Sequence, residues 1–178
     1  MRLRPATVAA LILAAMIALA GILVPTHAFA APGQFATCPT GNQVTSYSPP
    51  MTNTPTLTTG DIHTDFGPCV SSDLTLLTGS MDVHYTRIRS CTDPLSSGPN
   101  DFTIHWNNGK SSYLDLEATR SYVNGNFVMV VTGVVASGEF QGNKVVGELV
   151  LATFNQVACT TTGVTQTEGN FTISILPV

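Results

Sequence analysis

The chain has 178 residues, of which 43% are apolar and only 10% are charged, with 7 Lys and Arg against 11 Asp and Glu. This length is typical of a single domain. The acidic balance gives no basic surface for nucleic acid or an anionic membrane, so neither is expected as a partner.

The N-terminus is typical of an export signal. Arg2 and Arg4 precede an apolar run over residues 6–24, and Ala28-Phe29-Ala30 has the small-x-small pattern read by signal peptidase. We expect cleavage after Ala30 and secretion of the remainder. An apolar run of this length could also span a bilayer, so an uncleaved membrane anchor is the alternative.

The chain is therefore divided into three parts. Residues 1–30 are predicted as the signal peptide, residues 31–58 as an extended arm rich in Pro and Thr, and residues 59–178 as an all-β domain. After cleavage five basic and eleven acidic residues remain, a net charge of −6. No cofactor is predicted, and no membrane contact is expected once the signal is removed.

Four cysteines survive cleavage: Cys38, Cys69, Cys91 and Cys159. An even number in an exported chain indicates two disulfides. Cys69 and Cys91 lie symmetrically about a turn candidate at Ser80, which favours a bridge between them and leaves Cys38 to pair with Cys159. The other two pairings stay open, because Gly79 could instead mark a bulge in one long strand.

Alternating apolar and polar residues between Gly and Asn turns predict strands, and no stretch has sustained helical periodicity. Besides the hairpins below, strands are expected near Thr56–Thr64, Leu74–Thr78, Met81–Arg89 and Thr165–Leu176.

Two hairpin turns fix a register that keeps one face apolar. At residues 107–109 a three-residue loop with Gly109 in the left-handed conformation sets Trp106 opposite Lys110, Ile104 opposite Ser112 and Phe102 opposite Leu114. At Asn124-Gly125 a two-residue type I′ turn sets Tyr122 opposite Phe127, Ala118 opposite Val131, Leu116 opposite Gly133 and Leu114 opposite Val135.

A third turn is expected at Gly142-Asn143, where a two-residue loop would pair Val135 with Val150 and Val131 with Phe154. The result is an antiparallel meander of about eight strands. Such a sheet must close into a β-barrel or fold into a β-sandwich, and consecutive hairpins favour the barrel.

The third register predicts a second apolar face, on the outside of the hairpin over residues 127–154. A strand with one solvated face should alternate apolar with polar residues, so this face is expected to be covered by the chain itself or by a partner, which could be a second copy, another protein or a small apolar ligand. The residues assigned to it are Val128, Val130, Val134, Phe140, Val145, Leu149 and Leu151.

Motifs for catalysis are absent, which leaves an enzyme uncertain and disfavoured. Asp115 and Glu117 lie on one strand face at a spacing compatible with the carboxylate pair of a glycosidase, although a solvated hairpin face explains them more simply. His63, His84 and His105 could hold a metal, but their spacing does not force them together, and no metal site is predicted.

Two further features have mainly structural interpretations. Trp106 shares a face with Phe102 and Ile104, which favours a core anchor over a sugar-stacking platform. The stretch from Cys91 to Pro99 is the only candidate for the rigid loop of a protease inhibitor.

The chain resembles a group of small secreted proteins of high-GC Gram-positive (actinobacterial) bacteria that carry no assigned function. The resemblance is carried by the runs from Ile104 to Ser112 and from Thr132 to Gly142, by Cys159 and by residues 163–165. The resemblance covers roughly Cys69 to the C-terminus. It implies export, a β-rich domain and a disulfide, and it supplies no catalytic residue. The sequence therefore predicts a secreted, disulfide-stabilised β domain with a non-catalytic binding or cell-envelope role, with a small extracellular hydrolase or a protease inhibitor as alternatives.

Overall fold

The computed structural model describes residues 33–92, 101–124, 126–151 and 156–178, so the predicted signal peptide lies outside the described residues. The elements in chain order are β1 (Ala36–Cys38), β2 (Gly41–Met51), β3 (Thr56–Phe66), β4 (Val70–Ser71), β5 (Gly79–Arg89), β6 (Phe102–Trp106), β7 (Ser111–Val123), β8 (Asn126–Gly138), β9 (Lys144–Leu151), α1 (Gln156–Thr160) and β10 (Val164–Leu176). No helix in this part of the chain is long and apolar enough to cross a membrane.

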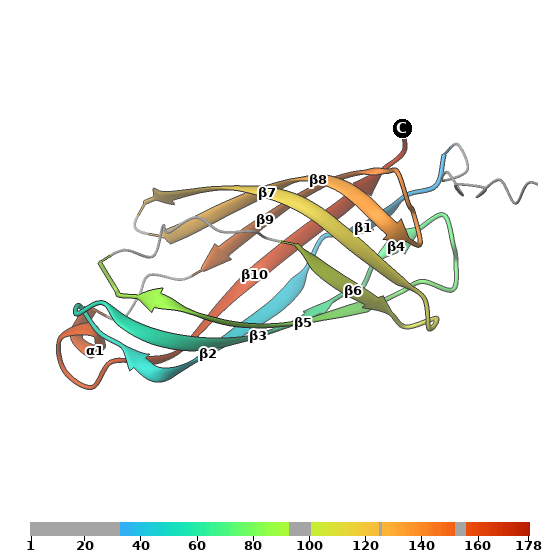
Figure 1. Ribbon diagram of the computed structural model, residues 1–178. Helices are drawn as coiled ribbons and strands as arrows, with labels where there is room; N and C mark the ends of the chain where they lie inside the picture. Colours follow the sequence, from blue (N-terminus) through green and yellow to red (C-terminus); the bar gives the residue numbers. More distant parts are fainter. Residues whose placement is uncertain (1–32, 93–100, 125, 152–155) are drawn as a thin grey trace, which may run out of the picture.

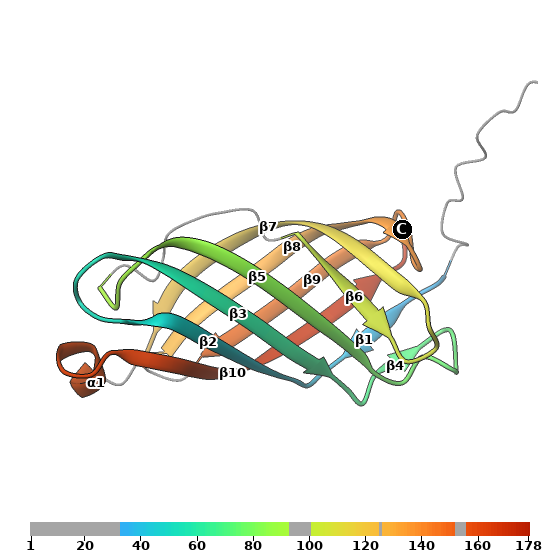
Figure 2. The same cartoon turned by 60° about the horizontal axis from the view of Figure 1, so that its bottom comes forward.

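Eight antiparallel strands close into a barrel, which confirms the all-β prediction and decides between barrel and sandwich (Figures 1 and 2). Seven pairings join strands that follow one another around the barrel. The eighth joins β10 to β2, from Asn170 opposite Asn42 to Val164 opposite Met51, and closes the sheet. β1 and β4 extend the sheet beside the C-terminal part of β10, where Cys38 lies opposite Ile173.

The barrel has two different ends, which we call the α1 end and the β4 end after the elements beside them (Figure 1). The β2–β3 connection, the last residues of β5 and β9 and the start of β10 lie at the α1 end. The connections over residues 67–78, 107–110 and 139–143 lie at the β4 end, next to β1.

Large side chains fill the barrel at the β4 end. The rings of Phe66 and Phe171 lie 5.5 Å apart, and those of Trp106 and Phe140 lie 6.2 Å apart at a right angle. Trp106 is buried and its indole Nε1 donates to the Ser112 hydroxyl at 2.9 Å, so the core-anchor prediction is confirmed. This end of the barrel is a closed core.

A strand predicted at Leu74–Thr78 is instead a loop that covers the β4 end. The Asn107 side chain holds it: Oδ1 accepts from the backbone amides of Leu77 and Thr78 at 2.8 and 3.0 Å, and Nδ2 donates to the Thr75 carbonyl at 2.9 Å. The loop buries Leu76 completely. An amide side chain thus satisfies the backbone groups that a strand neighbour would have paired.

The first two hairpin registers are confirmed. Phe102 lies opposite Leu114 and Ile104 opposite Ser112, with Gly109 at a φ of 81°. At the other turn all four predicted pairs form, and Asn124 has a φ of 51°. Both turns contain residues that tolerate the left-handed conformation, and this local requirement fixed the register.

The third register is wrong. The β8–β9 connection has five residues, with Phe140 at a φ of 64° and its side chain buried. Val131 consequently lies opposite Gly147 instead of Phe154. This is a shift of seven positions, and because an odd shift exchanges the two faces of a strand, every assignment on β9 is inverted.

The segment 31–58 is predicted as an extended arm, and its described residues, from 33 onward, form β1, β2 and the start of β3. β2 is a full barrel strand between β3 and β10. Its inward positions include Gln43 and Thr45, which are buried and polar. A strand with polar residues on its inner face lacks the apolar alternation that sequence analysis looks for.

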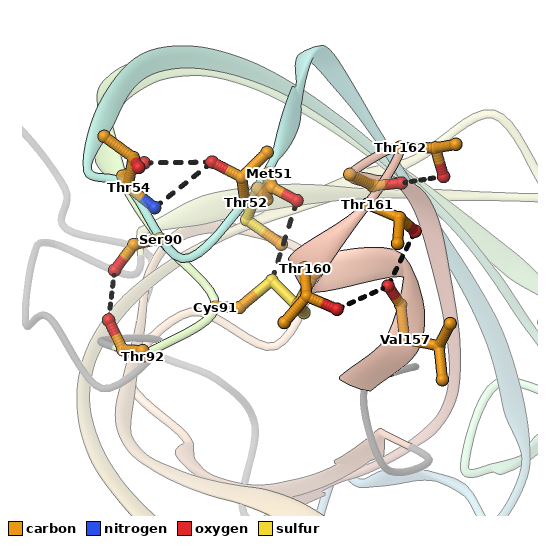
Figure 3. Close-up of a disulfide and its surroundings, with 12 residues drawn as sticks. Met51, Thr52, Thr54, Ser90, Cys91, Thr92, Val157, Thr160, Thr161 and Thr162 are labelled. Atoms are coloured by element: carbon orange, nitrogen blue, oxygen red, sulfur yellow. Dashed lines mark hydrogen bonds between the residues drawn. A yellow bond between two sulfur atoms is a disulfide. The ribbon is translucent and has the colours of Figure 1, made fainter.

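The two disulfides are Cys38–Cys69 and Cys91–Cys159, so the favoured pairing of Cys69 with Cys91 is wrong. The first bridge ties β1 to the residue before β4. The second lies at the α1 end, where the Cys91 sulfur lies 3.6 Å from the Met51 carbonyl oxygen (Figure 3). The backbone amide of Cys91 also donates to the Thr52 carbonyl at 2.8 Å. Ser80, taken as the centre of a turn, lies inside β5, which carries Cys69 and Cys91 to opposite ends of the barrel.

Candidate functional site

A cavity of about 170 Å³ lies inside the barrel toward the α1 end. Every one of the eight barrel strands contributes to its wall. The lining residues are Gln43, Thr45, Tyr47, Met51, Ile62, Met81, Val83, Tyr85, Arg87, Arg89, Asp101, Phe102, Arg120, Phe127, Met129, Leu149, Leu151 and Phe171. An eight-stranded barrel is just wide enough to hold either packed side chains or one small ligand. This barrel has packed side chains at the β4 end and a cavity at the α1 end.

One side of the cavity is apolar. It is formed by the inward positions of β8, β9 and β10, where Phe127, Leu149, Leu151 and Phe171 are all buried. Phe171 also packs on Phe102, with ring centroids 6.0 Å apart. These aromatic rings separate the cavity from the closed core at the β4 end, and they form an apolar floor.

The wall formed by β5 and β7 carries positive charge. Arg87 and Arg89 lie at inward positions of β5, and Arg120 lies at an inward position of β7; all three are half-buried. Burial lowers the pKa of the Arg120 guanidinium, and the positive charges of Arg89 and Arg87 lower it further. The three guanidinium groups are therefore close enough to repel one another inside the cavity.

The arginines converge because β6 is short. β6 pairs with β5 only at Gly79 and Ser80, and with β7 at residues 111–114. Toward the α1 end β5 continues to pair with β3, and β7 continues to pair with β8. At the α1 end, β5 and β7 extend beyond the start of β6 (Figure 2). These parts of the two strands carry Arg87, Arg89 and Arg120, which line the cavity.

Two tyrosines complete this wall. Burial raises the pKa of Tyr47 to about 12, and its hydroxyl lies 3.0 Å from Thr167 Oγ1. Burial also raises the pKa of Tyr85, although the nearby arginines oppose the shift. Both phenols are therefore neutral hydrogen-bond donors at physiological pH.

Tyr85 also positions the arginines. The Cζ atoms of Arg87 and Arg89 lie 5.8 and 5.3 Å from the centre of the Tyr85 ring, within the range of cation–π attraction. The ring lies over Gly60, its cross-strand partner on β3. A Cβ atom on Gly60 would collide with the ring, so the absence of a side chain there makes room for Tyr85.

The predicted second apolar face is divided by the structure. Val128, Val130 and Val134 do point outward, and Val130 and Val134 are 37% and 43% exposed. The other four residues lie in the interior and are buried: Phe140, Val145, Leu149 and Leu151. The reason is the inverted register of β9, whose outward apolar residues are Val146 and Val150. What remains outside is a short stripe of valines broken by Thr132, Glu148 and Lys144.

The carboxylates and histidines considered as candidates for catalysis or metal binding lie on the outside of the barrel. Asp115 and Glu117 are exposed on the outer face of β7 and do not line the cavity. His63 lies 2.7 Å from Asp82 and 3.2 Å from Asp65, and His84 lies 2.5 Å from Asp61. Within the described residues no group of three or more His, Cys, Asp or Glu side chains is arranged to hold a metal ion. Most of the predicted inhibitor loop lies outside the described residues.

Sequence analysis missed the arginines. A signal was present in β5, where every second residue faces inward. This inward face begins with Met81 and Val83 and continues with Tyr85, Arg87 and Arg89. A basic pair on the core face of a strand is unusual, because charged side chains are rarely buried without a functional or structural partner.

Comparison with models of protein families, with curated proteins and with solved structures finds no match to this chain. The functional inference therefore depends on the geometry of the cavity.

Proposed function

We propose that this protein is an exported, non-catalytic binding protein that holds one small molecule inside its barrel. The observation that carries the proposal is the division of the interior. Large side chains are buried at the β4 end, whereas the α1 end has a cavity with an apolar floor and several polar and charged groups on its wall. Binding sites for small molecules typically have this composition.

The two disulfides support an extracytoplasmic setting, because disulfides form and persist in oxidising compartments. Export through the N-terminal signal agrees with this setting, as does the resemblance to small secreted proteins. The Cys91–Cys159 bridge lies at the α1 end, next to Met51 and Val164, with which it forms a small cluster of buried residues. It fixes the end of β5 and the helix α1 at the rim of the cavity.

The size of the cavity limits the ligand. An apolar protein cavity of about 150 Å³ holds one benzene molecule, so the cavity of this barrel accommodates an apolar group of about the size of one aromatic ring. The carboxylates Asp115 and Glu117 are on the convex outer face, which favours binding over glycoside hydrolysis.

The test uses a neutral ligand, 3-phenylpropan-1-ol, titrated into the oxidised protein and followed by amide chemical shifts. We expect saturable shifts at cavity residues on β2, β5 and β9. Met129→Trp fills the cavity and should abolish them. Val130→Trp, on the adjacent outward position of the same strand, should leave them unchanged.

Circular dichroism and a thermal melt establish that each variant is folded. If Met129→Trp does not fold, Leu151→Phe fills the same space with a smaller change. Saturable binding that survives a folded cavity-filling variant contradicts the proposal. So does the absence of saturable shifts both with this alcohol and with compounds of the same skeleton that carry a charged head group.

A further inference from the structure

The cavity has an electrostatic character opposite to that of the whole chain. The chain beyond residue 30 carries a net charge of −6, yet all three of its arginines line the cavity. Among the lining residues that the structure describes, Asp101 is the only carboxylate. The Oδ1 atom of Asp101 accepts from the backbone amide of Leu116 at 3.3 Å, and the charge of Asp101 is the main cause of a raised pKa at Tyr113. Asp101 therefore interacts with β7.

We infer that the ligand is a small anionic amphiphile, whose carboxylate or phosphate is bound by Arg87, Arg89 and Arg120 and whose apolar part lies against the floor formed by β8, β9 and β10. This inference rests on the proposed function, because it names the chemical class of the molecule inside the barrel.

Guanidinium groups suit this role. Each presents several N–H donors in a planar fork that matches the oxygens of a carboxylate or phosphate. The positive charges of Arg87 and Arg89 act on Arg120, and an anion placed among the three guanidinium groups would attract all of them. The stacking of Arg87 and Arg89 on Tyr85 holds two of the guanidinium groups in place before the ligand arrives.

The apolar floor selects against plain inorganic anions. Phe127, Met129 and Leu149 offer no hydrogen-bond donor, and a fully hydrated anion would lose water there without compensation. A molecule with an acidic head and a ring-sized apolar body satisfies both walls at once. The tyrosine hydroxyls of Tyr47 and Tyr85 remain neutral donors and add hydrogen bonds without adding charge.

The experiment compares ligands that share one skeleton and differ in charge. The oxidised protein is titrated in 50 mM NaCl with 3-phenylpropionate, 3-phenylpropyl phosphate, 3-phenylpropan-1-ol and 3-phenylpropylamine, and binding is followed by amide chemical shifts. We expect both anions to bind at least tenfold more tightly than the alcohol, and the amine to bind most weakly. Whichever anion binds more tightly identifies the head group as carboxylate or phosphate.

The variants Arg87→Gln and Arg120→Gln should lower the affinity for the preferred anion at least fivefold each while leaving the affinity for the alcohol within twofold. Lys144→Gln is the matched control, because it removes the same charge from an exposed outward position on β9. It should have no more than a twofold effect on either ligand.

The possible failures are distinguishable. If the alcohol binds as tightly as the anions, or if Lys144→Gln weakens anion binding as much as the arginine variants do, the anionic class is wrong while binding inside the barrel stands. If none of the four compounds binds saturably, the proposed function fails together with this inference.

Discussion

The aromatic ring of Tyr85 occupies the space that a side chain on Gly60 would fill. The two residues face each other across β3 and β5 inside the barrel, and the ring carries two arginines on its surface. A glycine in the middle of a long strand weakens that strand. Glycine is nevertheless needed at position 60, because the Tyr85 ring of the neighbouring strand β5 lies over it.

Gly60→Ala is therefore expected to push the Tyr85 ring away from β3. Overpacking of this kind costs about 1 to 3 kcal/mol of unfolding free energy, measurable by urea denaturation, and the displaced arginines should bind an anionic ligand more weakly. In a Tyr85→Ala background the same substitution should cost less than about 0.5 kcal/mol, because the obstacle is gone. Equal costs in both backgrounds would show that the contact is not the cause.

The two faces of β9 can be tested with neighbouring residues. Val145 is 1% exposed and Val146 is 43% exposed. Val146→Lys should change the unfolding free energy by no more than about 0.5 kcal/mol, whereas Val145→Lys buries an unpaired charge and should cost several kcal/mol or prevent folding. Thermal melts of the two variants decide the register, and the opposite order of stability would restore the register predicted from sequence.

The disulfide at the α1 end should contribute substantially to stability. Its loop spans 68 residues, and constraint of the unfolded chain by a loop of that length corresponds to about 4 kcal/mol. We expect Cys91→Ala with Cys159→Ala to lower the unfolding free energy by roughly that amount and to weaken ligand binding. Peptide mapping without reduction should find Cys91 linked to Cys159, and a fragment linking Cys69 to Cys91 would contradict the structure.

The imidazole of His63 should titrate above its ordinary value of 6.5. The hydrogen bond to Asp82 is the main cause that raises this pKa. Loss of hydration is the next largest effect and opposes the shift, while Asp65 adds to the rise. Because the pKa is raised on folding, the pair stabilises the protein fully below pH 6.5, and that contribution is lost as the pH rises through the folded-state pKa. Histidine NMR titration should show a larger downward shift of this pKa in Asp82→Asn than in Asp65→Asn, and the reverse order would contradict the geometry.

Local turn chemistry made much of the fold predictable. Gly109 and Asn124 adopt left-handed conformations that few other residues tolerate, and from these two turns the registers of β6, β7 and β8 follow. The connection after β8 was not predictable in the same way. Phe140 adopts a positive φ because its side chain packs in the core, and this tertiary cause is not visible in the local sequence.

The candidate site was hidden for a related reason. Sequence analysis looks for a core that is apolar throughout, and β2 and β5 violate that pattern where they line the cavity, with Gln43 and Thr45 on one strand and Arg87 and Arg89 on the other. Departures of this kind are expected where a protein gives up core packing to bind something. The cysteines were identified as disulfide-bonded, but their partners depended on which strands the barrel brings together.

The pairing of β10 with β2 has a consequence for how the molecule assembles. The register that sets Glu168 opposite Val44 brings together residues more than a hundred positions apart, so the barrel stays an open sheet with two exposed edges until nearly all of the polypeptide is available. Contacts between such distant segments form slowly. Until the barrel closes, the unpaired edges of β2 and β10 can pair with strands of other chains. The protein is therefore most prone to aggregation before the closing step.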